Sequence, residues 1–238
     1  MDALDKPRVA NLKGKTNLVT ETDHLSEKTI KSIIRGSFPD HSFLAEESGQ
    51  DLSKSDYLWI IDPLDGTTNF VHGYPSFAVS IALYYKNEPQ VAVIIEMPNT
   101  KLYSAIKGEG VWCEGQPISC SESDSLEKSL LVTGFGYEHG ELWEENMRLY
   151  KHFTDTTQGV RRLGAAAVDL CHVASGKVDG FWEFDLQPWD TAAGILIAQE
   201  AGCLVTQMNG SDYRIYDNNI LVTNPKIHIE MVKNIEDV

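Results

Sequence analysis

The sequence predicts an α/β (α+β) fold in which mixed sheets are layered with helices. Apolar runs of strand length, separated by turn residues, follow one another in the first half of the chain, and helical and strand-like segments alternate in the second half. Successive antiparallel strands followed by β/α alternation are typical of such layered folds. With 238 residues, 42% of them hydrophobic, the chain is long enough to bury a sizeable core without disulfide staples.

The spacing of apolar residues defines the elements of the first half. Aliphatic residues near helical spacing predict a surface helix over 23–35. The run 57–61 (YLWII) is typical of a buried strand, and it ends directly before an acid. Further strands are expected at 41–46, 76–85, 90–96, 101–106 and 129–135, with hairpin turns at 87–89 and 98–100.

The second half predicts an alternation of helices with short strands. Helices are expected at 141–153, 165–175, 190–201 and 225–234, and strands at 178–184, 203–207 and 219–223. No repeat, low-complexity tract or obvious linker divides the chain. The sequence therefore indicates one unit, 1–238, with approximate lobes 1–140 and 141–238.

The charge and the apolar pattern exclude some classes of partner. A formal charge of −15 argues against a nucleic-acid or anionic-membrane partner, because both favour basic patches. No stretch approaches the roughly 18 apolar residues that a membrane span needs, and no secretory signal is visible. The four cysteines show no C-x-x-C spacing, which favours reduced thiols. We expect a soluble, cytoplasmic protein, and its excess of carboxylates is compatible with bound cations.

The segment 62–68 (DPLDGTT) carries the strongest chemical signal. Asp62 and Asp65 follow a rigid strand, and Pro63 restricts the backbone between them. Two acids three residues apart across a turn can converge on one point, and hard oxygen ligands of this kind suit Mg²⁺. Backbone N–H groups of Gly66, Thr67 and Thr68, opening a helix, can bind phosphate. A purely structural Asp-capped turn is the alternative.

Two further acidic positions are ambiguous on their own. Glu46 and Glu47 follow a predicted strand, where adjacent glutamates usually form a solvated end. Asp190 stands at a predicted helix start, where an acid is most often an N-cap. The residues around Asp190 are unusual, because Trp189 precedes it and small residues follow at 191–194. Small residues allow that helix to pack closely against a neighbour.

Two long motifs resemble the signatures of the inositol monophosphatase family. WIIDPLDGTTNFVH (59–72) is similar to the first signature, and PWDTAAGILIAQEAG (188–202) is similar to the second. AEESG (45–49) also fits, and the resemblance extends from about residue 12 to the end. It implies a layered αβαβα sandwich of the kind found in inositol monophosphatases and sugar phosphatases, a homodimer, and Mg²⁺ dependence with sensitivity to Li⁺.

The resemblance implies a site for two or three Mg²⁺ ions. Glu46, Asp62 and the Leu64 carbonyl would hold one ion, and Asp62, Asp65 and Asp190 would hold a second. Glu46 would also help to hold a third. The catalytic residues implied in this way are Glu46 and Thr67, which would position the attacking water, and Asp23, an acid near the metals.

The resemblance also implies a substrate site. The implied contacts are Gly66, Thr67, Thr68, Gly164, Ala166, Glu183 and Asp190, with Glu183 accepting bonds from vicinal hydroxyls. Arg161 and Arg162 are interpreted as structural or interfacial rather than as a phosphate clamp. The expected function is hydrolysis of small phosphate monoesters, foremost inositol-1-phosphate, by direct attack of water. The alternatives are a histidinol-phosphate or sugar-bisphosphate phosphatase, or a regulatory protein that binds a partner such as the transcription machinery.

Three departures from the family pattern accompany the resemblance. About 22 residues precede Asp23, so the first helix of the family is expected to be short or absent. Asn17 stands where an acid is common, and Cys203 replaces a glycine at the end of the second signature. None of these departures removes an implied metal ligand.

Overall fold

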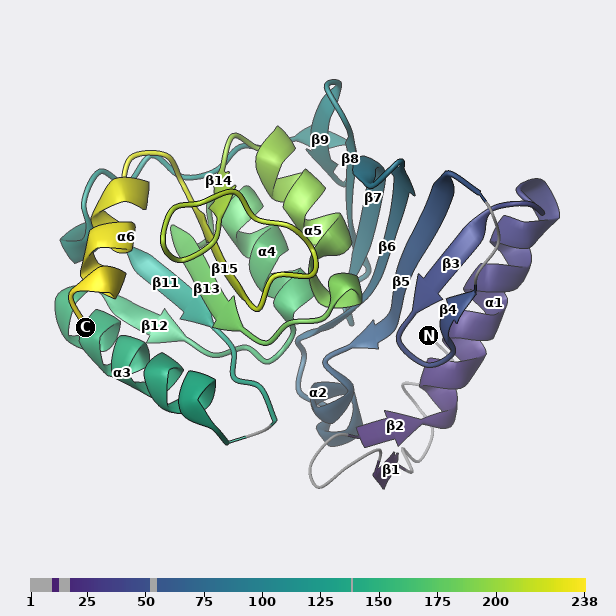
Figure 1. The fold of residues 1–238 in the computed structure, drawn as a ribbon, viewed down its shortest axis with the longest axis horizontal. Coiled ribbons are helices and arrows are strands. Elements are labelled where there is room, and N and C mark those ends of the chain that lie inside the picture. Colours follow the sequence, from purple (N-terminus) through teal and green to yellow (C-terminus); the bar gives the residue numbers. More distant parts are fainter. Residues whose placement is uncertain (1–9, 13–17, 52–54, 138) are drawn as a thin grey trace.

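In the described part of the chain, the two larger sheets and six α-helices form five layers in the order αβαβα (Figure 1). The computed structural model describes residues 10–12, 18–51, 55–137 and 139–238. One sheet has eight strands and the other five, and a separate two-stranded pair lies near the start of the chain. This arrangement confirms the layered sandwich with mixed sheets.

The eight-stranded sheet is antiparallel except at one pair of strands. Its order is β10-β9-β8-β7-β6-β5-β3-β4, and β3 runs parallel to β5. Its strands are β3 (Ser42–Ala45), β4 (Gly49–Asp51), β5 (Tyr57–Asp65), β6 (Phe77–Tyr85), β7 (Glu88–Met97), β8 (Lys101–Ile106), β9 (Gly110–Cys113) and β10 (Gln116–Pro117). The separate antiparallel pair consists of β1 (Ala10–Leu12) and β2 (Leu18–Thr20).

The five-stranded sheet has the order β12-β11-β13-β15-β14. Its strands are β11 (Leu130–Thr133), β12 (Gly159–Arg161), β13 (Gly180–Phe184), β14 (Leu204–Thr206) and β15 (Asn219–Thr223). β11 runs parallel to β12 and β13, whereas β15 is antiparallel to β13 and β14. Both sheets are therefore mixed, as the sequence predicts.

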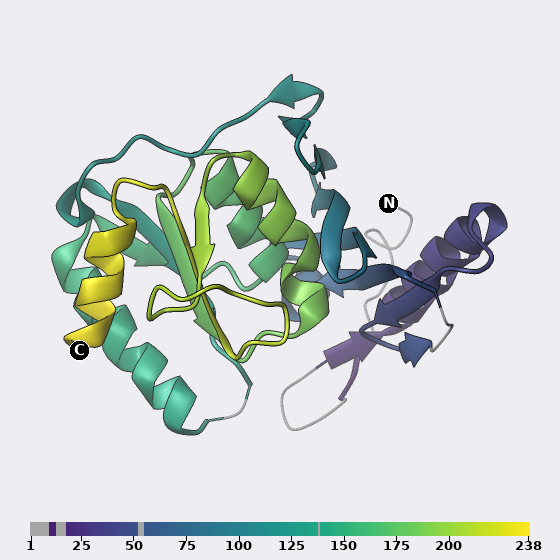
Figure 2. The same ribbon diagram turned by 45° about the horizontal axis from the view of Figure 1, so that its top comes forward.

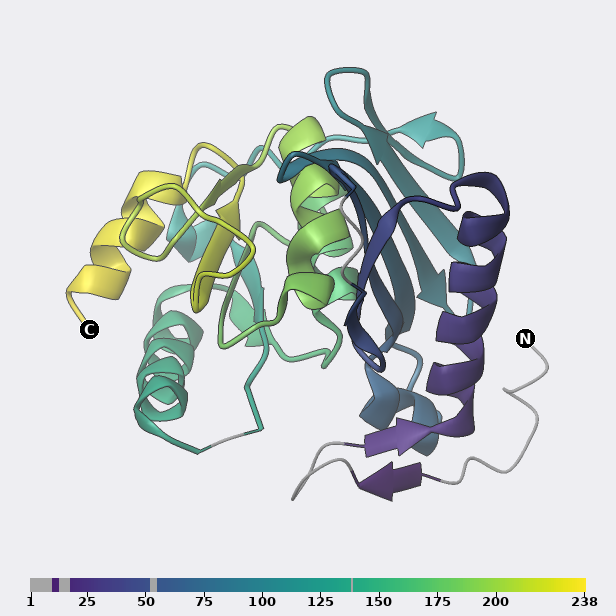
Figure 3. The same cartoon turned by 45° about the vertical axis from the view of Figure 1, so that its right-hand side comes forward.

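The helices form the outer and the middle layers (Figure 3). α1 (Glu21–Ser37) covers the outer face of the eight-stranded sheet. α4 (Ala166–Ala174) and α5 (Pro188–Glu200) fill the space between the sheets. α3 (Glu141–Thr156) and α6 (His228–Glu236) cover the far face of the five-stranded sheet, and the short α2 (Thr67–His72) follows β5. In the described part of the chain, every helix falls short of the length and apolar character that a bilayer crossing requires.

Strand alternation turns one acid from each sheet toward the middle layer. On β5, Ile60 belongs to the core around α4 and α5, whereas Ile61 packs on the α1 side. On β13, Phe181 faces the same middle layer, and Trp182 faces α3 and α6. Because side chains alternate along a strand, Asp62 follows Ile60 and Glu183 follows Phe181 onto the inner faces.

β5 is longer than predicted and contains a bulge. It continues through the two acids to Asp65 instead of ending at residue 61. Against β6, Asp62 pairs with Ser80 and Asp65 with Ala78, so β5 holds one extra residue there. Such a bulge re-aims the side chains beside it and tolerates a proline without an N–H. The two acids are therefore placed by an irregular strand rather than by a turn.

Some predicted boundaries are wrong by a few residues for identifiable reasons. Lys86 and Asn87 have positive φ angles of 51° and 66°, which form the hairpin turn, so Pro89 belongs to β7 and not to the turn. α5 begins at Pro188, because proline suits the first turn of a helix. Asp190 is therefore the third residue of α5 and not its N-cap. α6 begins at His228, later than the predicted start at residue 225.

The chain passes from one sheet to the other between β10 and β11 (Figure 2). This crossing segment precedes residue 140, at which the sequence divides the chain into two lobes. Its backbone is hydrogen-bonded to the residue that follows α5: Cys120 N donates to Ala201 O at 3.0 Å. The four cysteines are free thiols, two buried and two partly exposed. The division into lobes 1–140 and 141–238 stays a prediction.

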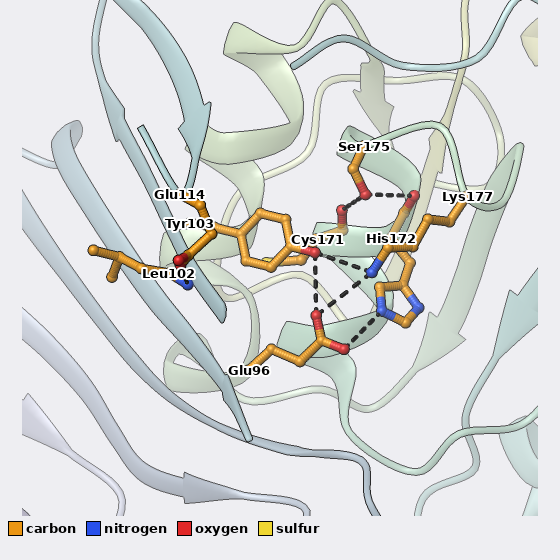
Figure 4. A network of polar contacts seen from close by, with 8 residues as sticks. All are labelled: Glu96, Leu102, Tyr103, Glu114, Cys171, His172, Ser175 and Lys177. Carbon is orange, nitrogen blue, oxygen red and sulfur yellow. Dashed lines mark hydrogen bonds and ion pairs between the residues drawn. The ribbon is translucent and has the colours of Figure 1, made fainter. Parts of the chain in front are cut away.

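A polar network joins the eight-stranded sheet to the end of α4 (Figure 4). Glu96 of β7 lies 3.2 Å from His172 Nε2 and accepts hydrogen bonds from the Tyr103 hydroxyl at 3.1 Å and Lys177 Nζ at 3.5 Å. The hydrogen bond with His172, aided by the charges of His172 and Lys177, lowers the pKa of Glu96 to about 2 against the opposing effect of burial. The carboxylate form therefore stabilises this end of α4.

Glu96→Gln is expected to lower the free energy of unfolding by about 1 kcal/mol at neutral pH, because it removes a charged acceptor of several hydrogen bonds. A folded-state pKa of about 2 lies below that of an unfolded glutamate. The advantage of the wild type is therefore complete above the unfolded pKa and is lost as the pH falls toward 2. Urea titrations from pH 7 to 2.5 measure the difference, and a pH-independent difference would contradict this account. Glu88→Gln, in an exposed ion pair with Lys107, is the control with little expected effect.

The two middle helices approach closely at Gly194 of α5. A methyl group built on Gly194 would lie 2.3 Å from Leu170 Cδ1 and 2.7 Å from Leu170 Cβ on α4. These distances are far inside van der Waals contact, so no larger residue fits without moving a helix. The small residues after Asp190 thus allow close packing, as the sequence predicts.

Gly194→Ala is expected to lower the free energy of unfolding by about 1–3 kcal/mol, because overpacking forces side chains and backbone to shift. Chemical denaturation measures this loss. Gly36→Ala on α1 is the matched control, since nothing lies within 4 Å of its added methyl. It should be neutral or slightly stabilising, because alanine favours helix over glycine. If Gly194→Ala had the same free energy of unfolding as the wild type, α4 and α5 could move apart to accept the methyl group without loss of stability.

Candidate active site

A cavity of about 920 Å³ opens where β5, β13 and three helices meet. Its wall includes the first residues of α2, α4 and α5. The N-caps of these helices are Gly66, Ala165 and Gln187, and all three line the cavity. The N-terminus of a helix carries partial positive charge and unpaired N–H groups. Their convergence makes the cavity suited to an anion such as phosphate.

Asp62 and Asp65 are held at this cavity by backbone N–H groups. Leu64 N donates to Asp62 Oδ1 at 3.0 Å, and Ala167 N, in the first turn of α4, donates to Asp65 Oδ2 at 2.7 Å. Gly66 follows with φ of 83°, and a methyl group there would lie 3.0 Å from Ser76 O. Both the conformation and the space require glycine at this position.

Thr67 connects the cavity to a buried acid on α1. The Thr67 hydroxyl lies 3.0 Å from Asp23 Oδ1 and 3.1 Å from the Leu64 carbonyl oxygen. Asp23 is fully buried and also accepts bonds from Thr20 N at 2.8 Å and Thr20 Oγ1 at 2.5 Å. The bond from Thr20 N is one half of the capping box of α1; in the other half, the Thr20 side chain accepts from the backbone N–H of Asp23. Asp23 therefore does not border the cavity itself but is hydrogen-bonded to Thr67, which does.

Asp190 has a structural bond as well as a place in the cavity wall. Its Oδ2 accepts a hydrogen bond from Gln187 N at 2.7 Å, which completes a capping box at the start of α5. The residue lines the cavity together with Glu46, Asp62 and Asp65. Asp190 is thus the third-residue acid of a capping box and not the N-cap, and this structural bond is compatible with its place in the cavity wall.

Burial and mutual repulsion raise the pKa values of the site acids. The pKa of Asp62 is raised well above its usual value by burial and then by Glu46, Asp65 and Asp190. Burial raises the pKa of Asp65 to about 7, although the Ala167 N–H opposes the shift. The pKa of Asp190 is raised by burial and then by Asp65. Such a cluster is unfavourable when ionised and is stabilised by positive charge.

The donor chemistry of the cavity fits a hard divalent cation. Glu46, Asp62, Asp65, Asp190 and the Leu64 carbonyl all border it, and they offer only oxygen atoms. Within the described ranges, no three acidic, histidine or cysteine side chains form a group that could hold a metal ion as they stand. Mg²⁺ takes few protein ligands and relies on water and substrate oxygens for the rest. An oxygen-only set with unfavourable mutual charge therefore suits Mg²⁺ better than zinc.

Glu183, Gly164 and Ala166 form another part of the cavity wall. Glu183 is buried, and its pKa is raised well above the usual value by burial and then by Asp190. Gly164 has φ of 80° and packs on Asn69, whose Nδ2 lies 2.7 Å from Leu163 O and 2.6 Å from Ser76 O. Asn69 thereby ties this wall to the turn after β5.

The structure brings most of the predicted site residues to one cavity. Those that border it are Glu46, Asp62, Leu64, Asp65, Gly66, Thr67, Gly164, Ala166, Glu183 and Asp190. Asp23 is connected to the cavity by its hydrogen bond with Thr67. Thr68 occupies the next position of α2 and does not border the cavity.

Several wall residues were not singled out from the sequence. Phe135, Tyr137 and His139 come from the segment after β11, and Asp185 follows β13. Nothing in their local sequence distinguishes them from ordinary loop residues. Arg162 also borders the cavity, and its interpretation as structural or interfacial stays a prediction. The signal available for Arg162 was its position before the Gly164–Ala167 run, next to the predicted substrate contacts.

Asp169 of α4 is a further buried acid behind the wall. Neither of its carboxyl oxygens has a hydrogen-bond partner among the described residues. Burial, followed by the charge of Glu183, raises its pKa well above the usual value. The surroundings of Asp169 therefore disfavour its ionised form.

The fold and this cavity define a class of layered phosphatases, and the chain belongs to the inositol monophosphatase family, whose model matches residues 1–238. The chain is 43% identical to the inositol monophosphatase structure from Anabaena, with a TM-score of 0.85 and coverage of 91% of this chain and 86% of that one.

Two curated relatives bear different names. The chain is 50% identical to the chloroplastic phosphatase IMPL1 of Arabidopsis thaliana, over 99% of this chain and 65% of that protein. It is 39% identical to the Nus factor SuhB of Pseudomonas aeruginosa, over 95% of this chain and 85% of that protein. The chain thus spans slightly less than two thirds of the plant relative.

Mg²⁺ is expected to raise the melting temperature of the protein, because a cation bound only by the folded state relieves the repulsion among the site acids. Asp62→Asn should raise the melting temperature without Mg²⁺ and reduce the response to it, since it removes one buried repelling carboxyl. Differential scanning calorimetry with and without Mg²⁺ measures both effects. Asp155→Asn, an exposed acid of α3, is the control that should keep the full response. If Mg²⁺ raised the melting temperature of Asp62→Asn as much as that of the wild type, Asp62 would not be a metal ligand.

Proposed function

We propose that this protein is a Mg²⁺-dependent phosphatase of small phosphate monoesters, with inositol-1-phosphate as its preferred substrate. The observation that carries the proposal is the meeting of buried carboxyls with three helix N-termini in one cavity. The helix ends favour the phosphate anion, and the carboxyls favour the cations that accompany it.

The proposed metal ligands are those implied by the family motifs. Glu46, Asp62 and the Leu64 carbonyl would hold one Mg²⁺, and Asp65 and Asp190 would share a second with Asp62; Glu46 would assist a third. When bound, Mg²⁺ supplies positive charge for the phosphate oxygens and the leaving alkoxide. Li⁺ would inhibit by replacing one of these ions.

Thr67 and Glu46 are the proposed positioning groups for water. The Thr67 hydroxyl donates a hydrogen bond to Asp23, so the lone pairs of the Thr67 oxygen can accept a hydrogen bond from water. Glu46 on the same wall can accept the second proton of that water. Asp23 therefore acts through Thr67 by fixing the direction of the hydroxyl. The water oxygen attacks phosphorus in line while one of its protons passes to Glu46; the ester P–O bond breaks, and the leaving alkoxide takes up a proton from solvent.

The phosphate and the alcohol are proposed to occupy opposite parts of the cavity. Backbone N–H groups at Gly66, Thr67 and Thr68 would hold the phosphate oxygens. Gly164, Ala166 and Glu183 would face the alcohol, and a carboxylate can accept bonds from two vicinal hydroxyls. Asp190 lies near both. This arrangement favours a polyol such as inositol over an alcohol without neighbouring hydroxyls.

A regulatory role is the second candidate, because one relative is named a Nus factor. A protein that acts by binding a partner does not need its site acids for function. Histidinol phosphate and sugar bisphosphates are the alternative substrates within the phosphatase class. A homodimer and a cytoplasmic location belong to the proposal as well; the chloroplastic name of the plant relative makes direct localisation necessary. Light scattering tests the dimer.

The wild type is expected to release phosphate from inositol-1-phosphate only with Mg²⁺, and with a higher kcat/KM than from histidinol phosphate or fructose-1,6-bisphosphate. Asp62→Asn and Asp190→Asn should each lower kcat/KM at least about a hundredfold, because they remove charge aimed at the reacting phosphate. Asp155→Asn is the control. A tenfold preference for either competitor would refute the inositol assignment.

Two further results would redirect the proposal. Rapid quenching should yield no phosphoenzyme, since water attacks directly; a trapped phosphoenzyme would refute the mechanism. Full function in cells of a catalytically dead Asp62→Asn variant would favour the regulatory role.

A further inference from the structure

We propose that Gly134 and Asn146 are positioning residues that hold the Glu183 carboxylate in place and thereby set the preference for polyol phosphates. The inference rests on the proposed function, in which Glu183 contacts the alcohol part of the substrate. Neither residue belongs to a sequence motif discussed above. Their effect follows from close contacts at the ends of β11 and β13.

Gly134 provides the space that the Glu183 carboxylate occupies. A methyl group built on Gly134 would lie 2.2 Å from Oε1, 2.3 Å from Oε2 and 2.5 Å from Cδ of Glu183. Non-bonded heavy atoms prefer separations of about 3.5 Å or more. Any larger residue at 134 must therefore displace this carboxylate. Because the obstructing atoms are the end of a flexible side chain, Glu183 can move away without unfolding the protein.

Asn146 fixes Gly134 relative to the strand that carries Glu183. Its Nδ2 donates to Gly134 O at 2.6 Å, and its Oδ1 accepts from Trp182 Nε1 at 2.6 Å. Asn146 lies on α3 and is only 2% exposed. The single amide thus joins the residue after β11 to the residue before Glu183 on β13.

A second bond keeps the two strand ends in register. Thr133 Oγ1 donates to Trp182 O at 2.6 Å, and both residues are fully buried. Buried, fully paired polar groups define one arrangement, because breaking them leaves unsatisfied donors or acceptors. The gap at Gly134 therefore stays opposite Glu183, and the carboxylate is held at the cavity wall.

This arrangement makes a selective prediction about substrates. A displaced Glu183 loses its hydrogen bonds to vicinal hydroxyls, whereas the phosphate and metal side of the cavity is unchanged. The loss should appear in KM for inositol-1-phosphate and not in kcat. Phenyl phosphate has no such hydroxyls, so its kinetics should not depend on Gly134.

The test is a double-mutant cycle of wild type, Gly134→Ala, Glu183→Ala and the double variant. Gly134→Ala should raise KM for inositol-1-phosphate about tenfold, as expected for lost bonds to a charged group, with kcat within about twofold. In the Glu183→Ala background it should add nothing, because the carboxylate is already gone. Gly140→Ala is the matched control, since nothing lies within 4 Å of its added methyl.

Asn146→Asp is a second variant that keeps the shape of the side chain but removes the donor to Gly134 O. It should reproduce the selective rise in KM. Equal effects of Gly134→Ala in both Glu183 backgrounds, or on phenyl phosphate as much as on inositol-1-phosphate, would overturn the inference.

Melting temperatures separate this inference from the proposed function. Gly134→Ala should lower the melting temperature when Glu183 is present and leave it unchanged in the Glu183→Ala background. If the wild type releases no phosphate from any substrate, the proposed function fails, but the melting cycle still tests the contact. Additive melting shifts would overturn the positioning role whatever the activity.

Discussion

The repulsion among buried acids is the constraint on which the rest of the structure depends. Asp62, Asp65 and Asp190 lie in one wall, and burial and mutual charge raise their pKa values. A fold tolerates such a cluster only if positive potential is aimed at it. The N-termini of α2, α4 and α5 supply part of that potential, and cations are suited to supply the remainder. The proposed binding of metal and of phosphate would thus have a common electrostatic origin.

The five layers deliver these groups to one place. Each sheet turns an acid toward the middle layer, Asp62 from β5 and Glu183 from β13, and α4 and α5 begin between them. The close approach at Gly194 keeps those two helices together. Asp62 and Glu183 therefore reach the cavity from different sheets, with the first turns of α4 and α5 between them.

The sequence allowed the layered fold and the acids of the cavity to be predicted, from local patterns and from the resemblance of two motifs to a known family. Strand and helix periodicity marked the elements, and the motif around Asp62 and Asp65 marked the acids. The bulge in β5 could not be predicted, since it depends on pairing with β6. Arg162 and Gly134 were missed for the same kind of reason: their importance comes from neighbours that are distant in the chain.

The network around Glu96 gives α4 a second anchor, far from the cavity. α4 begins where Ala167 N holds Asp65 and ends where His172 meets Glu96, and a nine-residue helix spans about 13 Å. α4 is thus held at both ends, and its C-terminal end contacts β7. Substitutions at the C-terminal end of α4 would be expected to tilt the helix and to shift the N–H group of Ala167 that holds Asp65. Directed evolution of this protein can therefore act on the position of Asp65 through residues that do not border the cavity.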